Sequence, residues 1–254
     1  MLIKDAIILA AGLGTRISRD VGNLPKPLVK ISNIPLIIYS IVPLLNIGIK
    51  HLYIVVNPRS LRPISRLVKK LPADVQLIEN KAPERDNGYS LILGMECIES
   101  STFFLTMSDH IYDPTIPNIL LHKDINEADI IVGADSNPRY VNINEATKIL
   151  AHNEVVQDIG KNITEFSHID IGLFIMKRDL YDIYYEYAEH NHVIKLSSLI
   201  RYSITQGKKV VISDINGLPW IDIDTIEDVR KAKTKAGELL RKVINIAYEH
   251  VVPL

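Results

Sequence analysis

"LAAGLGTR", residues 9–16, follows directly on the apolar residues Ala6–Ile8, and "PKPL", residues 25–28, comes shortly after it. An apolar run that ends in two closely spaced glycines is typical of a β-strand that turns sharply at its end. In an open parallel sheet, ligands bind at the carboxyl ends of the strands. This stretch therefore predicts an α/β fold and also the edge of the sheet that carries the function.

The first half of the chain alternates between short β-branched runs and longer helical stretches. The predicted strands are Ala6–Leu9, Leu52–Val56, Val75–Ile78, Phe103–Met107 and Asp129–Val132. The predicted helices are Leu36–Leu45, Leu61–Lys70, Tyr89–Ile98 and Pro117–His122. This alternation predicts a Rossmann-like, mostly parallel central sheet flanked by helices.

After Asp135 the alternation changes. Strands are predicted at Thr147–Leu150, Val155–Ile159, Ile169–Met176 and Lys209–Ser213, and helices at Leu180–His190 and Leu196–Thr205. These segments predict a smaller mixed lobe that packs over the carboxyl edge of the sheet. One further helix is predicted from Thr225, its cap, to about Tyr248. We interpret residues 1–254 as a single domain made of a first half (about 1–135), a second half (about 136–224) and a C-terminal helix (225–250).

The composition excludes several classes of protein. The 254 residues are 47% hydrophobic and carry a formal net charge of -1, with lysine and arginine scattered singly, so no nucleic-acid surface is expected. No apolar run approaches the roughly 20 residues that a membrane span needs. We therefore expect a cytoplasmic protein without a membrane span. Cys97 is the only cysteine, which excludes a disulfide within the chain and a cysteine metal cluster.

The glycine stretch suits a phosphate group. Gly12 and Gly14 permit backbone conformations that bring main-chain N–H groups close to an anion, and Arg16 offers several donors in a fixed fork. A purely structural tight turn is the alternative. The stretch is neither a P-loop nor a clean GxGxxG motif, and Asn57 stands where a dehydrogenase has an acidic residue.

Lys26 stands between two prolines. Pro25 and Pro27 favour extended backbone around it, so that its ammonium group points in a narrow range of directions. A rigid turn with a solvated lysine is the alternative. The framing favours a lysine with a defined target.

Taken together, these motifs resemble the signature of the sugar-phosphate nucleotidyltransferases. The motifs that carry the resemblance are "LAAGLGTR" (9–16), "LPKPL" (24–28), "NGYSL" (87–91), "MSDHIY" (107–112) and "PWIDIDTIEDV" (219–229). "ERDNGYSL" (84–91), "EATKI" (145–149), "IGKNITEF" (159–166) and "WIDIDTIEDVRKA" (220–232) are similar to the archaeal CTP:inositol-1-phosphate cytidylyltransferases of that family. The resemblance implies a GT-A-like nucleotidyltransferase fold, in which the first half binds nucleotide and the second half binds the acceptor.

The chain also departs from the family pattern. It lacks the Pro-x-Thr that sugar-nucleotide pyrophosphorylases commonly carry between the arginine and the lysine, which weakens a hexose-phosphate acceptor. Asp170-Ile171-Gly172 replaces the more usual Asp-Thr-Gly, which concerns acceptor binding but not the metal chemistry.

The resemblance implies a role for each matching residue. Arg16 and Lys26 are the expected catalytic residues, Arg16 on the β- and γ-phosphates and Lys26 on the α-phosphate or the attacking phosphate. The expected nucleotide-binding residues are Leu9, Ala10, Ala11, Gly12, Gly14, Thr15, Glu84, Asn87, Gly88 and Ser90. The expected acceptor-binding residues are Glu145, Lys148, Lys161, Asp170 and Gly172. Asp109, with Asp222 or Asp224, is expected to hold Mg²⁺, because that ion prefers oxygen ligands. His110 is expected to orient Asp109 instead of binding the metal.

The implied reaction is the transfer of CMP from CTP to L-myo-inositol 1-phosphate, assisted by Mg²⁺. The partners are thus CTP and a small phosphorylated polyol or alcohol. A different acceptor, either phosphocholine or a sugar 1-phosphate with UTP or dTTP, is an alternative. A catalytically silent nucleotide-binding subunit is another, although such a subunit would be expected to lose Lys26 or the aspartates. Tyr181, Tyr184, Tyr185 and Tyr187 recur at helical spacing and form a packing or subunit surface, compatible with a homodimer.

Overall fold

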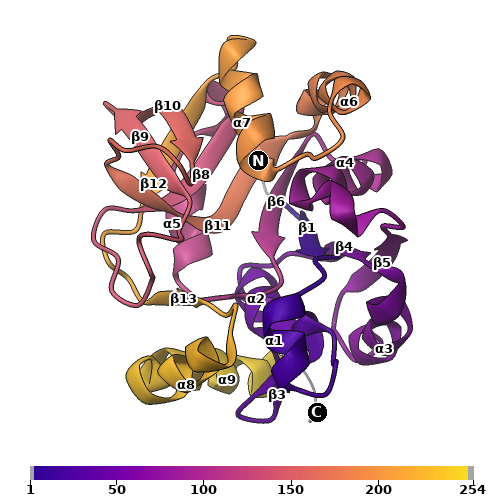
Figure 1. Cartoon of the computed structure of the whole chain (residues 1–254). Coiled ribbons are helices and arrows are strands. Elements are labelled where there is room, and N and C mark those ends of the chain that lie inside the picture. The colour runs from indigo at the N-terminus through magenta and orange to yellow at the C-terminus, as the bar shows by residue number, and fades with distance from the viewer. Residues whose placement is uncertain (1–2, 251–254) are drawn as a thin grey trace.

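A nine-stranded mixed sheet runs through the computed structural model, which describes residues 3–250, with only the backbone of His250 (Figure 1). Its strand order is β5-β4-β1-β6-β11-β8-β12-β10-β9. The strands are β1 (Asp5–Ala10), β4 (His51–Val56), β5 (Asp74–Glu79), β6 (Thr102–Met107), β8 (Ile130–Asp135), β9 (Lys148–His152), β10 (Val155–Gly160), β11 (His168–Lys177) and β12 (Val210–Asp214). All nine had been predicted from the sequence, within a few residues at each end.

The first four strands of this order are parallel, and the remainder of the sheet is mixed. β11 runs antiparallel to both β6 and β8, with Leu173 opposite Thr106 and Ile175 opposite Ile131. The mixed second half was therefore predicted correctly. This half is not a separate layer, because β11 pairs directly with β6 and continues the same sheet sideways.

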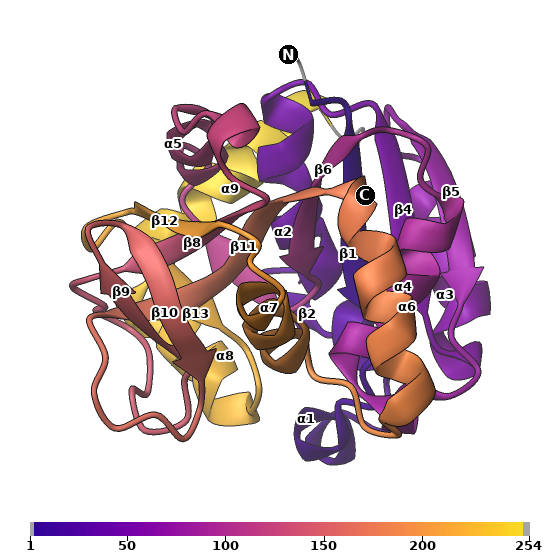
Figure 2. The same ribbon diagram turned by 90° about the horizontal axis from the view of Figure 1, so that it is seen from above.

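Helices cover both faces of the sheet (Figure 2). They are α1 (Thr15–Asp20), α2 (Leu36–Asn46), α3 (Pro58–Val68), α4 (Asn87–Cys97), α5 (Ile116–Leu121), α6 (Tyr181–His190), α7 (Leu196–Thr205), α8 (Ile226–Lys235) and α9 (Gly237–His250). Side chains of β1 alternate between two cores: Ile8 packs with the cluster that includes α2 and α9, whereas Ile7 and Leu9 pack with α4 and α7. The two buried faces account for the unbroken apolar run that opens the chain.

The C-terminal helix predicted from Thr225 to about Tyr248 is two helices that meet at Ala236. Thr225 caps α8 as expected, in a capping box with Asp228. The backbone leaves helical geometry at Ala236, and α9 begins at Gly237. This bend lets α8 contact the strand β13 (Trp220–Asp222) while α9 packs along α2.

Short elements complete the chain. β13 pairs with β7 (His110–Tyr112), and β2 (Lys30–Ile31) pairs with β3 (Ile34–Pro35). One-turn 3-10 helices lie at Lys26–Leu28, Pro83–Arg85, Ile125–Glu127 and Arg178–Leu180. Within residues 3–250, no helix combines the length and the apolar composition that crossing a bilayer requires.

The four tyrosines of α6 do not share one environment. Tyr184 is fully buried, with its hydroxyl bonded to Ser203, whereas Tyr185 is about half exposed. Tyr187 packs against Tyr202 of α7. The helix therefore uses part of its aromatic face for packing, and the homodimer stays a prediction.

Candidate active site

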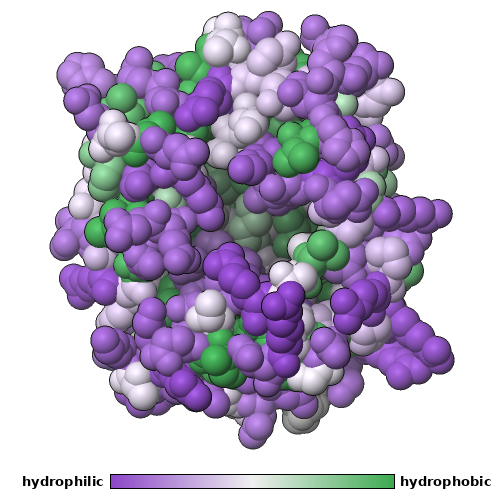
Figure 3. Space-filling view, viewed as in Figure 1, coloured by the Kyte–Doolittle hydropathy of each residue, from purple (hydrophilic) through white to green (hydrophobic). Residues whose placement is uncertain are grey.

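A cavity of about 840 Å³ opens at the carboxyl ends of β1 and β6. In the space-filling view it is the hollow near the centre of the face, with a pale and green floor and a mostly hydrophilic rim (Figure 3). All of the predicted site residues line it except Gly88 and Lys148. The predicted residues thus come together at one edge of the sheet.

The glycine loop and the proline-framed lysine meet inside this cavity. Gly14 adopts a left-handed conformation (φ 56°), and a β-carbon added there would lie 2.6 Å from the Cβ of Lys26. Only glycine combines this backbone conformation with so close an approach. The two motifs that opened the sequence argument are therefore parts of one structure.

Asn57 supports the glycine loop through two hydrogen bonds, a role that the sequence analysis missed. Its Nδ2 donates to the carbonyl oxygens of Ala11 (3.1 Å) and Gly12 (3.3 Å). Its Oδ1 accepts from the backbone N–H of Ser60 and so caps α3. The sequence does place a polar residue, Asn57, at the end of the second predicted strand. The sequence analysis took it only as evidence against a dehydrogenase.

The ammonium group of Lys26 lies between two carboxylates. Its Nζ is 2.5 Å from Oδ2 of Asp109 and 2.5 Å from Oδ1 of Asp224. Burial alone would lower the pKa of Lys26, but the two carboxylates outweigh it and raise the pKa above its usual value. The side chain is therefore a buried ammonium whose charge is stabilised by the two carboxylates.

The backbone that presents Lys26 differs from the prediction. Pro25 is extended, but Lys26–Leu28 form a 3-10 turn in which the N–H of Leu28 donates to the carbonyl of Pro25. The extended conformation expected around Lys26 was wrong. The turn prevails because it directs the side chain at the aspartates, which provide two charged hydrogen bonds.

Arg16 lies at the rim of the same group. It donates to Oδ2 of Asp224 at 2.8 Å and lies 3.6 Å from the carboxylate of Glu145. More than half of its side-chain surface is exposed, at 58%. An exposed guanidinium at the mouth of the cavity can move onto an incoming phosphate.

Asp109 is held on its other side by His110. The His110 Nδ1 lies 2.8 Å from Oδ1 of Asp109, so the imidazole orients this carboxylate, as the sequence analysis expected. Burial would raise the pKa of Asp109, but Lys26 and His110 together lower it well below its usual range. Burial would lower the pKa of His110, but its hydrogen bond to Asp109 and the charges of Asp109, Asp222 and Asp170 raise it.

The carboxylates fit a divalent cation that is shared with phosphate groups. Asp109 and Asp224 both reach the point now occupied by the Lys26 ammonium, so both can face one positive charge. Within the described part of the chain, no three His, Cys, Asp or Glu side chains gather closely enough to hold a metal by themselves. Mg²⁺ in nucleotide sites commonly takes only one or two carboxylates and fills its other positions with phosphate and water. Of the two candidates for the second ligand, Asp224 shares this point with Asp109.

Asp222 lines the cavity beside this group instead of joining it. It lies opposite His110 in the β7–β13 ribbon. Burial and the negative charges of Asp224 and Asp109 raise the pKa of Asp222. The charge of His110 lowers it, but the net shift is upward.

The neighbouring part of the wall, formed by β11, carries the predicted acceptor residues Asp170 and Gly172. The Asp170 Oδ1 accepts from the backbone N–H of Gly172 at 2.8 Å, and burial raises the pKa of Asp170 to about 6. Gly172 has a φ of 71°, and a β-carbon there would lie 2.8 Å from Nε2 of His110. Glycine is therefore required where the acceptor wall approaches the Asp109–His110 pair.

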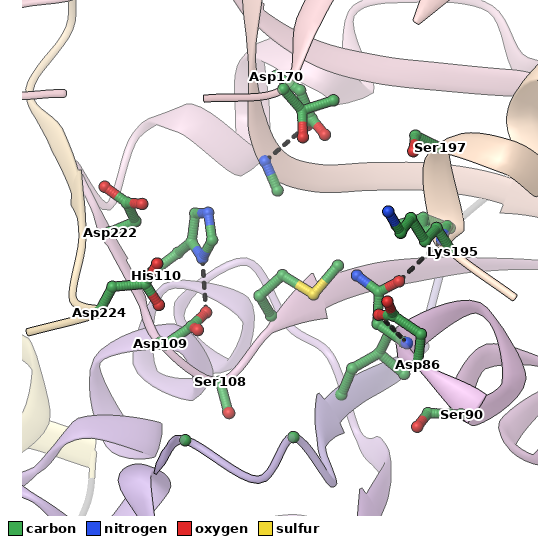
Figure 4. A pocket seen from close by; sticks show the side chains of 18 of the residues that line it. Asp86, Ser90, Ser108, Asp109, His110, Asp170, Lys195, Ser197, Asp222 and Asp224 are labelled. Atoms are coloured by element: carbon green, nitrogen blue, oxygen red, sulfur yellow. Dashed lines mark hydrogen bonds and ion pairs between the residues drawn. The ribbon is translucent and has the colours of Figure 1, made fainter. Parts of the chain in front are cut away.

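The start of α7 contributes polar side chains that the sequence analysis did not select. Lys195, Ser197, Ser198 and Arg201 line the cavity. Figure 4 shows Lys195 and Ser197 together on the side of the pocket away from Asp109, Asp222 and Asp224. Arg201 is oriented by Asp158 at 2.6 Å. Their helix had been predicted, but its polar face has no distinctive motif to indicate which residues face a ligand.

Two of the predicted residues lie outside the cavity lining. Gly88 donates its N–H to the carbonyl of Ile194, and a β-carbon there would lie 2.7 Å from that oxygen. It is a glycine required by packing, so the predicted base contact through Gly88 has no support in this arrangement. Lys148 donates to the backbone carbonyl of Lys161 and lies 5.6 Å from the ring of Phe166. Its long side chain is used to hold the Lys161 turn.

Comparison with known proteins identifies one domain family. The model of the MobA-like NTP transferase domain matches residues 6–205. Two relatives bear the name "Bifunctional IPC transferase and DIPP synthase": one from Thermococcus kodakarensis is 33% identical over 233 residues, and one from Aquifex aeolicus is 31% identical over 232 residues. These alignments cover 92% and 91% of this chain but 50% and 51% of the relatives. The chain thus spans about half the length of these curated relatives.

A solved structure is also similar over nearly the whole chain. It is described as the inositol-1-phosphate CTP transferase from T. maritima. The two chains superpose with a TM-score of 0.88 at 25% sequence identity, covering 96% of this chain and 97% of the other. The same architecture therefore occurs in a protein with that description.

Proposed function

We propose that this chain, which belongs to the family of MobA-like NTP transferase domains, transfers CMP from CTP to L-myo-inositol 1-phosphate and releases pyrophosphate. The single observation that carries the proposal is the position of Lys26. Its buried ammonium is bonded to Asp109 and Asp224 and lies against the glycine loop, within a cavity large enough for a nucleotide and a second small molecule.

The proposed reaction is an in-line displacement at phosphorus. An oxygen of the acceptor phosphate attacks the α-phosphorus of CTP, the bond from that phosphorus to the bridging oxygen of the β-phosphate breaks, and pyrophosphate leaves with the electron pair. The attacking oxygen is already anionic, so no general base is needed. The protein must instead hold two mutually repelling phosphate groups in line and balance their charge.

The positive side chains of the cavity suit these two tasks. Lys26, charged and held by two carboxylates, faces the reacting phosphates, where charge is redistributed during the displacement. Arg16, exposed at the rim, binds the outgoing pyrophosphate end of CTP. Lys161 and Arg201, which also line the cavity, bind the acceptor phosphate.

Asp109 and Asp224 are the residues that would hold Mg²⁺. When bound, the ion would neutralise charge on the phosphate groups of both substrates. Lys26 would then exchange its carboxylate partners for phosphate oxygens.

The identity of the acceptor rests on the relatives and on the acceptor wall. The printed names of the relatives and of the similar structure include an IPC transferase and an inositol-1-phosphate CTP transferase. The wall around Asp170 offers carboxylate and backbone groups, which suit the several hydroxyls of a polyol. Glu145 at the rim adds a second carboxylate for such hydroxyls.

The test is pyrophosphate release by purified protein with Mg²⁺. CTP, UTP, dTTP, ATP and GTP are each combined with inositol 1-phosphate, phosphocholine and glucose 1-phosphate. Activity confined to CTP with inositol 1-phosphate, and lost in Lys26→Ala and Asp109→Ala, is the expected result. Activity with another pair would replace the substrates, and silence in every combination from folded protein would favour a nucleotide-binding subunit.

A further inference from the structure

Asp86 has a backbone conformation that is unfavourable for any residue except glycine. Its φ is 76° and its ψ is -180°. This combination brings the β-carbon of an L-residue against its own backbone and is occupied almost only by glycine. Asp86 lies in the wall of the cavity, between the turn Pro83–Arg85 and α4.

Helix capping does not account for an aspartate at this position. Asp86 precedes α4, and its Oδ1 accepts from the backbone N–H of Asn87 at 2.6 Å. At the N-cap, the residue just before a helix, glycine is nearly as favourable as aspartate, and it would adopt this backbone without strain. Stability alone therefore favours glycine at residue 86, so the carboxylate has another use.

The neighbouring Arg85 anchors the turn that precedes Asp86. Its guanidinium donates to the carbonyl oxygens of Ala188 and Asn191 and lies 4.0 Å from the ring centre of Tyr89. Its own carbonyl accepts from the N–H of Ile194. The turn is thus fastened to the segment between α6 and α7, and the Asp86 carboxylate is held in place before any ligand binds.

Asp86 lies at the end of the cavity that is remote from the phosphate chemistry. In Figure 4, Asp86 and Ser90 lie together on one side of the pocket, and Asp109, Asp222 and Asp224 lie on the other. A nucleoside triphosphate that lies along the cavity with its phosphates at Lys26 places its base toward Asp86. Ser90, one helical turn after Asp86, accepts a hydrogen bond from Asn80, so its own hydroxyl proton is available to a ligand.

We propose that the Asp86 carboxylate reads the exocyclic amino group of cytosine and thereby selects CTP over UTP. Oδ1 is engaged by Asn87, and Oδ2 is the oxygen that accepts from the amino group. UTP carries a carbonyl oxygen at the same position, which would face the carboxylate without a proton between them. The hydroxyl of Ser90 supplies a donor for the ring nitrogen of cytosine, which accepts a hydrogen bond; the corresponding nitrogen of uracil carries a proton. This inference rests on the proposed function, because it assumes a cytidine nucleotide.

The test compares the equilibrium affinities of CTP and UTP, by isothermal titration calorimetry with Mg²⁺ and no acceptor. The proteins are wild type, Asp86→Asn and Asp86→Gly. We expect both variants to lower the ratio of CTP affinity to UTP affinity by about tenfold or more, because the selective acceptor is lost. We also expect Asp86→Gly to unfold at the same temperature as wild type or higher, because the strain is removed.

Asn153→Gly is the matched control. Asn153 also has a positive φ, of 48°, but it lies in the turn between β9 and β10, away from the cavity lining. Asn153→Gly should leave the ratio of CTP affinity to UTP affinity unchanged. Wild type that prefers CTP, together with variants that keep the same ratio, would overturn the role of Asp86 but leave the proposed function standing. Wild type without any preference for CTP would overturn both.

Discussion

The indole ring of Trp220 lies parallel to the imidazole ring of His110, with 6.0 Å between the ring centres and 6° between the planes. The Trp220 Nε1 donates to the fully buried Asp135 at 2.7 Å, and His110 in turn holds Asp109. Asp135 also accepts from the backbone N–H groups of Gly217 and Asn137. A continuous set of contacts therefore leads from the end of β8 to the carboxylate beside Lys26.

Trp220→Phe should separate the packing of this ring from its hydrogen bond. The variant keeps an aromatic ring against His110 but leaves one oxygen of Asp135 without its donor, which costs about 1–3 kcal/mol of folding free energy. We expect a several-fold decrease in kcat, because Asp109 is less firmly held, with little change in CTP affinity. Chemical denaturation and steady-state kinetics measure the two effects. A destabilised variant with full kcat would leave Trp220 as a packing residue only.

Replacing Lys26 should affect both the reaction and the metal. Lys26→Met removes positive charge from the reacting phosphates, and we expect the barrier to rise by on the order of 3 kcal/mol, roughly a hundredfold in kcat. It also removes the ammonium group that lies between Asp109 and Asp224, which keep only Arg16 and His110 as their outer partners. Mg²⁺ should therefore raise the unfolding temperature of the variant more than that of wild type.

Lys30→Met is the control for Lys26, because it removes an exposed lysine from the same segment. It should leave kcat and the response to Mg²⁺ unchanged. An equal response to Mg²⁺ in wild type and Lys26→Met would argue against a metal held by Asp109 and Asp224.

Gly14→Ala and Gly22→Ala form a matched pair. Both glycines have positive φ, 56° and 69°, so each alanine should cost about 1–2 kcal/mol of folding free energy from backbone strain. Only at residue 14 would the added methyl group also press on Lys26, since nothing lies within 4 Å of a β-carbon at residue 22. We expect kcat to fall strongly in Gly14→Ala and to stay near wild type in Gly22→Ala. If kcat fell equally in both variants, backbone strain, and not the contact with Lys26, would account for the loss.

Asp170 should make stability depend on pH in the acidic range. Burial raises its pKa from 3.8 to about 6, so the folded state favours the protonated carboxyl group. The resulting stabilisation is complete below about pH 4 and is lost as the pH rises through about 6. Asp170→Asn should remove this dependence and be more stable than wild type at pH 7 by about 1–2 kcal/mol, with allowance for partial solvent screening.

The measurement is urea denaturation at a series of pH values between 4 and 8. Asp20→Asn, which changes an exposed aspartate on α1, should keep the wild-type dependence. A dependence unchanged by Asp170→Asn would assign the titration to another group.

Local sequence patterns predicted most of the regular structure. Long apolar runs and helical periods carry their information within a few residues, so all nine strands of the main sheet could be located. The glycine loop and "WIDID" also indicated the site, because unusual backbone and repeated carboxylates stand out locally. The bend at Ala236 was missed because the residues on either side of it continue a good helical pattern.

The features that complete the site depend on pairs that are remote in sequence. The β7–β13 ribbon joins Asp222 to His110 through three-residue strands, which are too short to show a period. Asp86 shows no local sign of its strained backbone, and the contacts of the neighbouring Arg85 are with a segment about a hundred residues away. Arg201 also shows no local sign of its place in the cavity, because that place depends on how α7 packs against the remainder of the fold.

The β7–β13 ribbon also determines when the cavity is completed during synthesis. Lys26 and Asp109 emerge early from the ribosome, but Asp224 follows Asp109 only after on the order of ten seconds of translation. Until β13 pairs with β7, the lysine has at most one of its two carboxylate partners, and the wall formed by Trp220 and Asp222 is absent. The arrangement of Lys26 between Asp109 and Asp224 therefore forms only when a late segment of the chain joins an early one.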